Sequence, residues 1–210
     1  MGSALVKKAK PTQVEKIEEK QDKSAIFLVL GPSGVGKDTL MDGAKVYILE
    51  SGDYVFIKRV ITRPADAGGE EHIPATVEEF EKQKPDFCLW WGAHGLFYGI
   101  PDKAVRDALS NNKKVIVNVS RGAIGDAQDK FGNICPVTTV EINASPNVIR
   151  NRLTSRGRES PEEIEERIRR GEEMSKSVEQ VAKKLVRVLN DTTVEDGVNA
   201  FLKAIDYEKK

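Results

Sequence analysis

Residues 31–40 combine three glycines, a lysine, a carboxylate and two hydroxyls directly after the apolar run 25–30, which is typical of a buried strand. Gly31, Gly34 and Gly36 let successive backbone N–H groups turn into one concavity, and the start of the following helix adds the positive end of its dipole. Lys37 supplies a mobile ammonium to the outer phosphates of a ligand. Strand, spacing and helix agree, so the segment predicts binding of a nucleoside triphosphate.

One position departs from the usual form of such a loop. The hydroxyl residue that normally follows the lysine and ligates magnesium is Asp38 here, and Thr39 keeps a hydroxyl one residue later. A carboxylate can bind Mg²⁺ directly or through one of its waters. The alternative is that Asp38 only adds a favourable negative charge to the first helical turn. Because phosphoryl transfer needs Mg²⁺ between the outer phosphates, we expect Asp38 and Thr39 to hold or orient the metal.

Seven arginines and no lysine lie between positions 150 and 170. Arginine matches phosphate oxygens with its planar fork and keeps its charge, which favours contacts with a polyphosphate. The alternative is a solvated helix face on which interspersed glutamates pair with them. Arg156 and Arg167 flank Gly157, a layout typical of a hinged lid over about 150–172. We expect both to stabilise the transferring group, and Arg152 to contact the nucleotide.

The predicted elements alternate between strands and helices. We expect main strands at 25–30, 54–61, 115–119, 137–142 and 185–189, and short strands at 87–91 and 96–100. We expect helices over 40–50 and 194–207, and three further helices that begin near residues 76, 145 and 160. This order predicts an α/β P-loop three-layer sandwich with a mainly parallel five-stranded core sheet and the site at the carboxyl ends of its strands. Residues 25–207 form one domain; residues 1–24 are a charged extension in which residues 12–15 could cap a short helix.

The overall charge is balanced, with 33 Lys and Arg against 33 Asp and Glu in 210 residues. No global field therefore draws the protein to nucleic acid or to a membrane. The apolar runs are only strand-length and the N-terminus is charged, which predicts a cytoplasmic protein. Cys88 and Cys135 lack metal-ligand spacing and are expected to be buried thiols in a reducing compartment. The sequence leaves the oligomeric state open.

At this level the chain resembles the guanylate-kinase-like branch of the P-loop nucleoside monophosphate kinases. The shared segments are the loop 31–37, the Thr-Arg-Pro turn 62–64, the segment 94–99, the arginine lid, and Asn190 with Asp191. The resemblance covers residues 25–205. It implies that Arg63 and Tyr98 hold the phosphate of the acceptor and that Asn190 lies near the adenine.

The positions that read guanine in that branch differ here. The strand 87–91 has no carboxylate to accept from the guanine N–H groups, Asp66 stands in place of a second phosphate-binding arginine, and His72 corresponds most nearly to a tyrosine. An acidic pair is also missing from 117–120. A binding site that has no acceptor for the N–H groups of a ligand leaves them buried and unpaired, and therefore rejects that ligand. This argues against a guanine substrate.

A narrower resemblance, to the ribose 1,5-bisphosphate phosphokinases, fits these positions. It is carried by residues 59–72, the Gly-Lys-Asp end of the phosphate loop, and residues 91–99, 117–121 and 156–159. In that group Asp38 is normal; Trp90, Gly92 and His94 depart from its pattern. The resemblance implies that ATP phosphorylates the 1-phosphate of ribose 1,5-bisphosphate to 5-phosphoribosyl 1-diphosphate, in bacterial phosphonate breakdown.

The expected site follows from both lines of reasoning. ATP is expected to contact Gly31, Pro32, Ser33, Gly34, Val35, Gly36, Lys37, Asp38, Thr39, Arg152 and Asn190, with Lys37, Arg156 and Arg167 as catalytic residues. The sugar phosphate is expected to contact Arg59, Arg63, Asp66, Glu71, His72, Tyr98 and Arg121, mostly in an acceptor-binding insertion at about 59–100. Asp66, Glu71 and His72 are candidates for bonds to ribose hydroxyls.

Alternatives remain at this stage. His72 and His94 lie beside turns and could only shape them. The whole chain could be a nucleoside monophosphate kinase with unusual specificity. It could also be a non-catalytic guanylate-kinase-like interaction module, although its intact Gly36-Lys37 pair and lid arginines argue against that.

Overall fold

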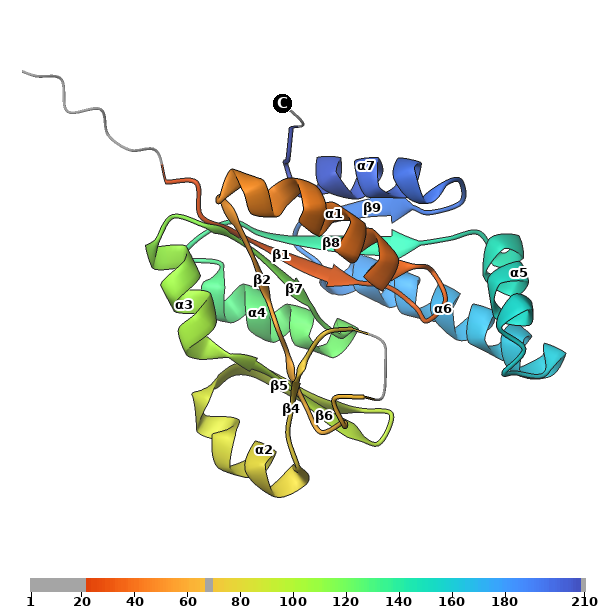
Figure 1. The fold of residues 1–210 in the computed structure, drawn as a ribbon, viewed down its shortest axis with the longest axis horizontal. Helices are drawn as coiled ribbons and strands as arrows, with labels where there is room; N and C mark the ends of the chain where they lie inside the picture. Colours follow the sequence, from red (N-terminus) through yellow and green to blue (C-terminus); the bar gives the residue numbers. More distant parts are fainter. Residues whose placement is uncertain (1–21, 67–69, 209–210) are drawn as a thin grey trace, which may run out of the picture.

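A five-stranded parallel sheet forms the centre of the protein. The computed structural model of the chain describes residues 22–66 and 70–208, in the strand order β2-β7-β1-β8-β9 (Figure 1). The strands are β1 (Ala25–Leu30), β2 (Tyr54–Ile57), β7 (Lys114–Asn118), β8 (Val137–Asn143) and β9 (Leu185–Leu189), and every pairing between them is parallel. The predicted α/β class and five-stranded core sheet are confirmed.

Helices cover both faces of this sheet, because central parallel strands are apolar on both sides. On one face lie α1 (Lys37–Ser51) and α7 (Val194–Ala204), which share a buried cluster with Phe27 and Val29. On the other lie α3 (Asp102–Ser110), α4 (Ile124–Phe131) and the C-terminal part of α6 (Pro161–Val181), which pack on Ile26 and Leu28 (Figure 1). The alternating residues of β1 thus divide between two cores, and the result is the predicted three-layer sandwich.

A second, four-stranded sheet has the order β4-β3-β6-β5. It consists of β3 (Val60–Ile61), β4 (Ile73–Pro74), β5 (Phe87–Ala93) and β6 (Leu96–Pro101). The helix α2 (Val77–Gln83) and the short 3-10 turn η1 (Lys84–Asp86) lie between β4 and β5, and Phe80 of α2 packs on Phe87 and Phe97. The predicted capping box that opens α2 is present: Thr76 and Glu79 bond each other's backbone N–H groups.

The single strand predicted over 54–61 is wrong. The chain divides at Lys58 and Arg59: residues 54–57 pair with β7 in the main sheet, and residues 60–61 pair with β6 in the second sheet. The apolar residues resume directly after the charged pair Lys58 and Arg59, and an interruption of two residues does not by itself show that the two halves belong to different sheets. The division places Arg59 between the two sheets.

The last predicted helix is too long, because α7 ends at Ala204 and not at Tyr207. Asp206 takes a left-handed backbone with φ 55°, which ends the helix and lets Tyr207 pack edge-on against Tyr54. The elements β4, α3 and α4 were not predicted individually. The expected cap at residues 12–15 lies outside the described residues. Within the described ranges, none of the helices has the length and apolar character needed to cross a bilayer.

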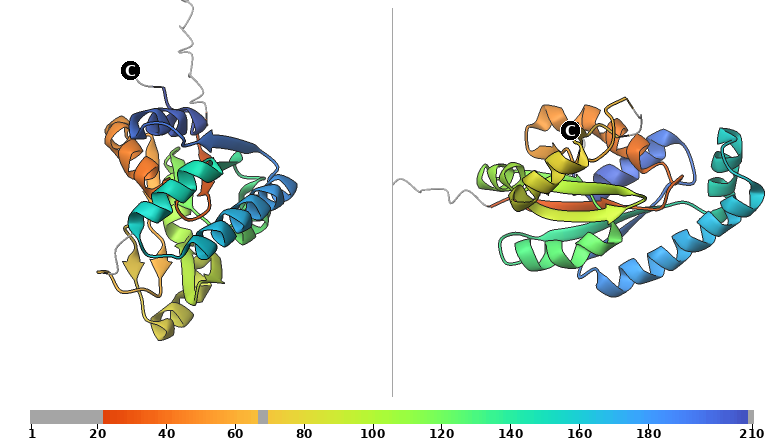
Figure 2. Two further views of the ribbon diagram at one scale, coloured as in Figure 1. Left: turned by 90° about the vertical axis from the view of Figure 1, so that its right-hand side faces the viewer. Right: turned by 90° about the horizontal axis from the view of Figure 1, so that it is seen from below.

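The two helices α5 (Pro146–Arg156) and α6 stand together at one end of the main sheet (Figure 2). Between them Gly157 has φ 61°, a left-handed conformation that ends α5. Ser160 then begins α6 with a capping box to Glu163, as the sequence predicted. This helix pair is the segment that the sequence suggested as a lid, and that role remains a proposal.

Candidate active site

The loop between β1 and α1 is shaped by two left-handed glycines, Gly34 with φ 93° and Gly36 with φ 86°. Between them Val35 is fully buried, and its carbonyl oxygen accepts hydrogen bonds from Asn190 Nδ2 at 2.7 Å and from Arg152 Nη1 at 3.2 Å. Arg152 and Asn190 therefore hold the loop from outside the cavity, from α5 and from the end of β9. Neither side chain was expected to support the loop itself.

A cavity of about 940 Å³ opens beside this loop, at the carboxyl ends of the parallel strands. It brings together most of the predicted site residues: Gly31, Pro32, Ser33, Gly34, Gly36, Lys37, Asp38, Thr39, Arg59, Tyr98, Arg121, Arg156 and Arg167. The predicted residues Val35, Arg152, Asn190, Arg63, Asp66, Glu71 and His72 are not among those that line it.

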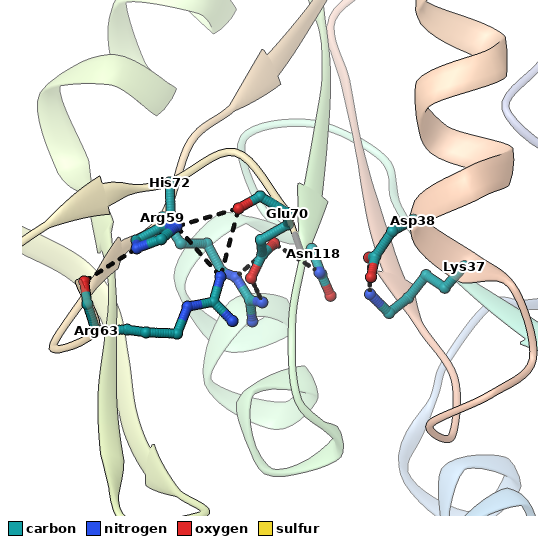
Figure 3. Close-up of polar contacts among 7 residues, drawn as sticks. All are labelled: Lys37, Asp38, Arg59, Arg63, Glu70, His72 and Asn118. Carbon is teal, nitrogen blue, oxygen red and sulfur yellow. Dashed lines mark hydrogen bonds and ion pairs between the residues drawn. The ribbon is translucent and has the colours of Figure 1, made fainter. Parts of the chain in front are cut away.

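Lys37 and Asp38 form an ion pair at the first turn of α1, with Nζ and Oδ1 2.6 Å apart (Figure 3). The Lys37 side chain is largely buried, whereas that of Asp38 is half-exposed to the cavity. Burial lowers the pKa of the Lys37 ammonium, and the adjacent Asp38 carboxylate opposes that shift. The loop thus presents an ammonium and a solvent-accessible carboxylate side by side.

Across the cavity, Arg59 is held by a carboxylate that the sequence reasoning missed. Its Nε lies 3.2 Å from Glu70 Oε2, and its Nη2 bonds Glu70 Oε1. Asn118, at the end of β7, donates Nδ2 to Glu70 Oε2 at 2.9 Å (Figure 3). Burial lowers the pKa of Arg59 to about 10, so the guanidinium stays protonated near neutral pH.

Two aromatic rings form the surface on which Arg59 rests. Trp91 of β5 and Tyr98 of β6 are cross-strand neighbours whose rings stack 5.6 Å apart at an angle of 5°. The Arg59 guanidinium lies 4.8 Å from the Tyr98 ring centroid and 5.7 Å from that of Trp91. Trp90 points to the other face of the sheet and is 49% exposed. This wall offers stacking and no carboxylate.

Arg63 and His72 form a separate polar group beside the Arg59 pair. His72 Nε2 lies 3.1 Å from the Arg63 carbonyl oxygen, and its Nδ1 lies 3.2 Å from Arg63 Nη2. Nδ1 also lies 3.1 Å from the backbone carbonyl oxygen of Glu70, so the His72 ring connects the backbone at residue 63 with that at residue 70. Arg63 Nε is buried and has no hydrogen-bond partner among the described residues. His72 therefore shapes the loop, whereas Arg63 retains an unused donor.

The other two predicted sugar contacts point elsewhere. Asp66 is exposed, and Glu71 pairs with Lys58 at 2.5 Å on the surface. The structure brings neither carboxylate to the cavity, so their expected bonds to ribose hydroxyls lack support.

The helix pair contacts the phosphate loop through Arg167 of α6. Its Nη1 donates to Ser33 Oγ at 2.9 Å, and its Nη2 lies 2.5 Å from Glu159 Oε1. Arg156 and Glu159 also line the cavity. Arg167 thus contacts the phosphate loop, Arg156 lines the same cavity, and Arg167 has an acidic partner that was not predicted.

Curated relatives match nearly the full described chain. A ribose 1,5-bisphosphate phosphokinase PhnN from Acidiphilium cryptum is 40% identical over 177 residues, which are 84% of this chain and 90% of the relative. One from Rhizobium etli is 36% identical over 188 residues, covering 83% of this chain and 93% of the relative. The chain belongs to the ribose 1,5-bisphosphate phosphokinase family.

Some members of the family are longer. A bifunctional ribose 1,5-bisphosphokinase-thymidine phosphorylase from Roseobacter denitrificans is 44% identical over 182 residues, 86% of this chain. The chain spans about a quarter of that protein, because the match covers 26% of its length. No protein-family model matches the chain. Among solved structures, guanylate kinase from Anaplasma phagocytophilum has a TM-score of 0.64 at 16% identity, covering 89% of this chain and 86% of that one. That likeness confirms the guanylate-kinase-like P-loop fold.

The sequence reasoning did not assign several residues that line or support the site, among them Glu70, Asn118 and Glu159. Glu70 lies inside the segment that carries the resemblance, but nothing local distinguishes it from Glu71. Asn118 has a readable signal, because it is a polar residue at the end of an otherwise apolar strand and is only 4% exposed. Glu159 comes two residues after Gly157, and nothing in the sequence distinguishes it from the other glutamates of that segment.

Proposed function

We propose that the chain is an ATP-dependent kinase that transfers the γ-phosphoryl group to the 1-phosphate of ribose 1,5-bisphosphate, giving 5-phosphoribosyl 1-diphosphate. The observation that carries this proposal is one continuous cavity with the phosphate loop on one side and Arg59, Tyr98 and Trp91 on the other. Membership of the family supports the choice of donor and acceptor.

On the donor side, the loop amides and Lys37 bind the β- and γ-phosphates. The left-handed Gly34 and Gly36 give the loop its turn, and the N-terminus of α1 begins at Lys37. A bound anion here would also oppose the effect of burial on the Lys37 pKa, since a nearby negative charge favours an ammonium. The donor phosphates are therefore held by backbone groups and one cation.

On the acceptor side, no strong general base is needed. A phosphate monoester loses its second proton near pH 6, so its oxygen is already anionic at neutral pH. Catalysis then consists of orientation and charge neutralisation. Arg59, Tyr98 and Arg121, which line the cavity, are the candidates to hold the acceptor phosphates, together with Arg63, whose Nε has no partner among the described residues.

The residues at the start of α1 fit a magnesium ion. Asp38 exposes an oxygen donor to the cavity, and the Thr39 hydroxyl lies next to it in sequence. Mg²⁺ is commonly held by one or two such protein oxygens, with waters and substrate phosphates completing its octahedron. When bound, the metal would neutralise charge on the outer phosphates. In this proposal Asp38 and Thr39 hold or orient it.

The helix pair would complete the site. Arg167 contacts Ser33 of the phosphate loop, Arg156 lines the same cavity, and Arg167 has Glu159 as a partner that a phosphate could replace. Closure of α5 and α6 about Gly157 would bring these cations to the transferring group and exclude water.

The wall of the acceptor side supports a sugar phosphate rather than GMP. Guanine presents adjacent N–H groups that need a buried acceptor, and β5 contains no carboxylate. The stacked Trp91 and Tyr98 suit the apolar face of a sugar ring instead.

The direct test is turnover of labelled MgATP with ribose 1,5-bisphosphate, GMP, dGMP or no acceptor. We expect ADP and a new diphosphate only with ribose 1,5-bisphosphate. Turnover with GMP alone would overturn the acceptor assignment and leave a nucleoside monophosphate kinase. Absence of MgATP binding in calorimetry would instead favour the non-catalytic interaction module.

A further inference from the structure

We propose that Glu70 is a positioning residue for the acceptor phosphate: with Asn118, it fixes the Arg59 guanidinium against Tyr98 and Trp91 so that the free donors of Arg59 serve the acceptor. This inference rests on the proposed function and deepens it. It assigns Glu70 and Asn118 an indirect role, through Arg59.

The hydrogen bonds of Glu70 indicate that its carboxylate is committed to this task. An ionised carboxylate offers about four lone-pair positions. Arg59 Nε and Nη2 occupy two of them, and Asn118 Nδ2 occupies a third. One position remains, so Glu70 cannot accept from both hydroxyls of a ribose diol while it holds Arg59. Its role is to hold the arginine.

The donors of Arg59 lead to the same conclusion from the other side. A guanidinium has five N–H donors in a rigid fork. Glu70 uses one on Nε and one on Nη2, while Nη1 donates to none of the residues that the structure describes. Arg59 itself lines the cavity. A fork fixed at one edge leaves its other N–H groups for a ligand.

Burial gives this pair more weight than a surface ion pair. The Arg59 and Glu70 side chains are 11% and 18% exposed, whereas the neighbouring Lys58–Glu71 pair is 52% and 64% exposed. An exposed pair contributes little because water screens it. A partly buried guanidinium without its acid partner has both a desolvation cost and freedom to leave its position.

The network also connects the two sheets of the protein. Arg59 lies between β2 and β3, Tyr98 belongs to β6 of the second sheet, and Asn118 ends β7 of the main sheet. Glu70 therefore sets the position of the Arg59 group relative to the carboxyl ends of the parallel strands, where the donor phosphates bind. Without Glu70 the guanidinium would keep its charge but would no longer be held in a fixed position relative to the main sheet.

The test compares Glu70→Gln with wild type, measuring KM separately for ribose 1,5-bisphosphate and for MgATP. We expect the acceptor KM to rise about 10- to 100-fold, with the MgATP KM within about 2-fold of wild type, because the lost bonds are charge-assisted and lie at Arg59, on the side of the cavity assigned to the acceptor. Glu78→Gln is the matched control: it removes an exposed ion pair with Lys82 on α2, the helix between β4 and β5, and is expected to leave both KM values unchanged.

A double-mutant cycle separates positioning from a general structural role. If Glu70 acts through Arg59, the variant with both Arg59→Met and Glu70→Gln has an acceptor KM close to that of Arg59→Met alone. Should Glu70→Gln not fold, Asn118→Leu removes one donor from the carboxylate and is expected to raise the acceptor KM about 3- to 10-fold.

The positioning role is overturned by an unchanged acceptor KM in Glu70→Gln, by equal rises in both KM values, or by multiplicative effects in the double variant. In all three cases wild type still turns over ribose 1,5-bisphosphate. Failure of wild type to use that acceptor overturns the proposed function instead, so the two failures are distinguishable.

Discussion

The carbonyl group of Val35 offers a quantitative test of how the phosphate loop is held. Its oxygen accepts from Asn190 Nδ2 at 2.7 Å and from Arg152 Nη1 at 3.2 Å, and Val35 is fully buried. Each single loss, Asn190→Ala or Arg152→Met, leaves one donor in place. We expect each to lower the free energy of unfolding by about 1 kcal/mol, the net value of an ordinary hydrogen bond.

The double variant should lose more than the sum. With both donors gone, a buried carbonyl has no partner among the described residues, and such an oxygen costs a further ~1–3 kcal/mol. We therefore expect a total loss of about 3–5 kcal/mol, so that the coupling between the two sites is about 1–3 kcal/mol. The two donors lie 38 residues apart in sequence, and only their shared acceptor couples them.

Urea unfolding without nucleotide measures this coupling, because no ligand charge then contributes. Asn147→Ala is the control, since Asn147 only accepts a bond from Arg150 on the surface and its loss should change stability by less than about 0.5 kcal/mol. In calorimetry, MgATP should bind less tightly to each single variant than to wild type, and least tightly to the double variant. Additive losses within experimental error would refute the argument that Val35 connects the two side chains.

Three further predictions concern the metal, the loop and the thiols. Asp38→Asn should raise the Mg²⁺ concentration for half-maximal activity about 10-fold while leaving thermal stability nearly unchanged; an identical magnesium titration would remove Asp38 from the metal site. Gly31→Ala should cost about 3 kcal/mol in urea unfolding, because a Cβ there would lie 2.3 Å from the Ile142 carbonyl oxygen; a wild-type midpoint would show that the backbone relaxes freely. Burial raises the pKa of Cys88 and of Cys135 to about 11, so little thiolate exists at pH 8 and both should resist alkylation in the native protein; rapid modification before unfolding would contradict this.

The phosphate loop and the fold class could be derived from the sequence. The loop is a local structure: its glycines, Lys37 and the flanking strand and helix are contiguous, and their conformations follow from short-range sterics and hydrogen bonding. The alternation of apolar runs and capped helices likewise predicted the parallel sheet. Both cysteines are buried, as expected. These features depend on neighbours within a few residues, which the sequence displays directly.

The acceptor side depended on tertiary structure. The apolar residues of 54–57 and 60–61 could not reveal that the strand divides between two sheets, because both groups pair within a sheet and only their partner strands, β7 and β6, differ. The sequence pattern also could not distinguish Glu70 from Glu71. Glu70 contacts Arg59 and Asn118, whereas Glu71 pairs with Lys58 at the surface. Asn190 and Arg152 were assigned to the nucleotide but lie against Val35.

The sequence by itself therefore predicted a phosphate-binding loop, the residues that form it, and the family to which the chain belongs. Only the packing of two sheets and a helix pair decided which charged side chains face that loop and which face water. The physical reason is that a charged residue's role depends on the partners brought to it across long stretches of chain, and those partners carry no periodicity that a sequence pattern can record.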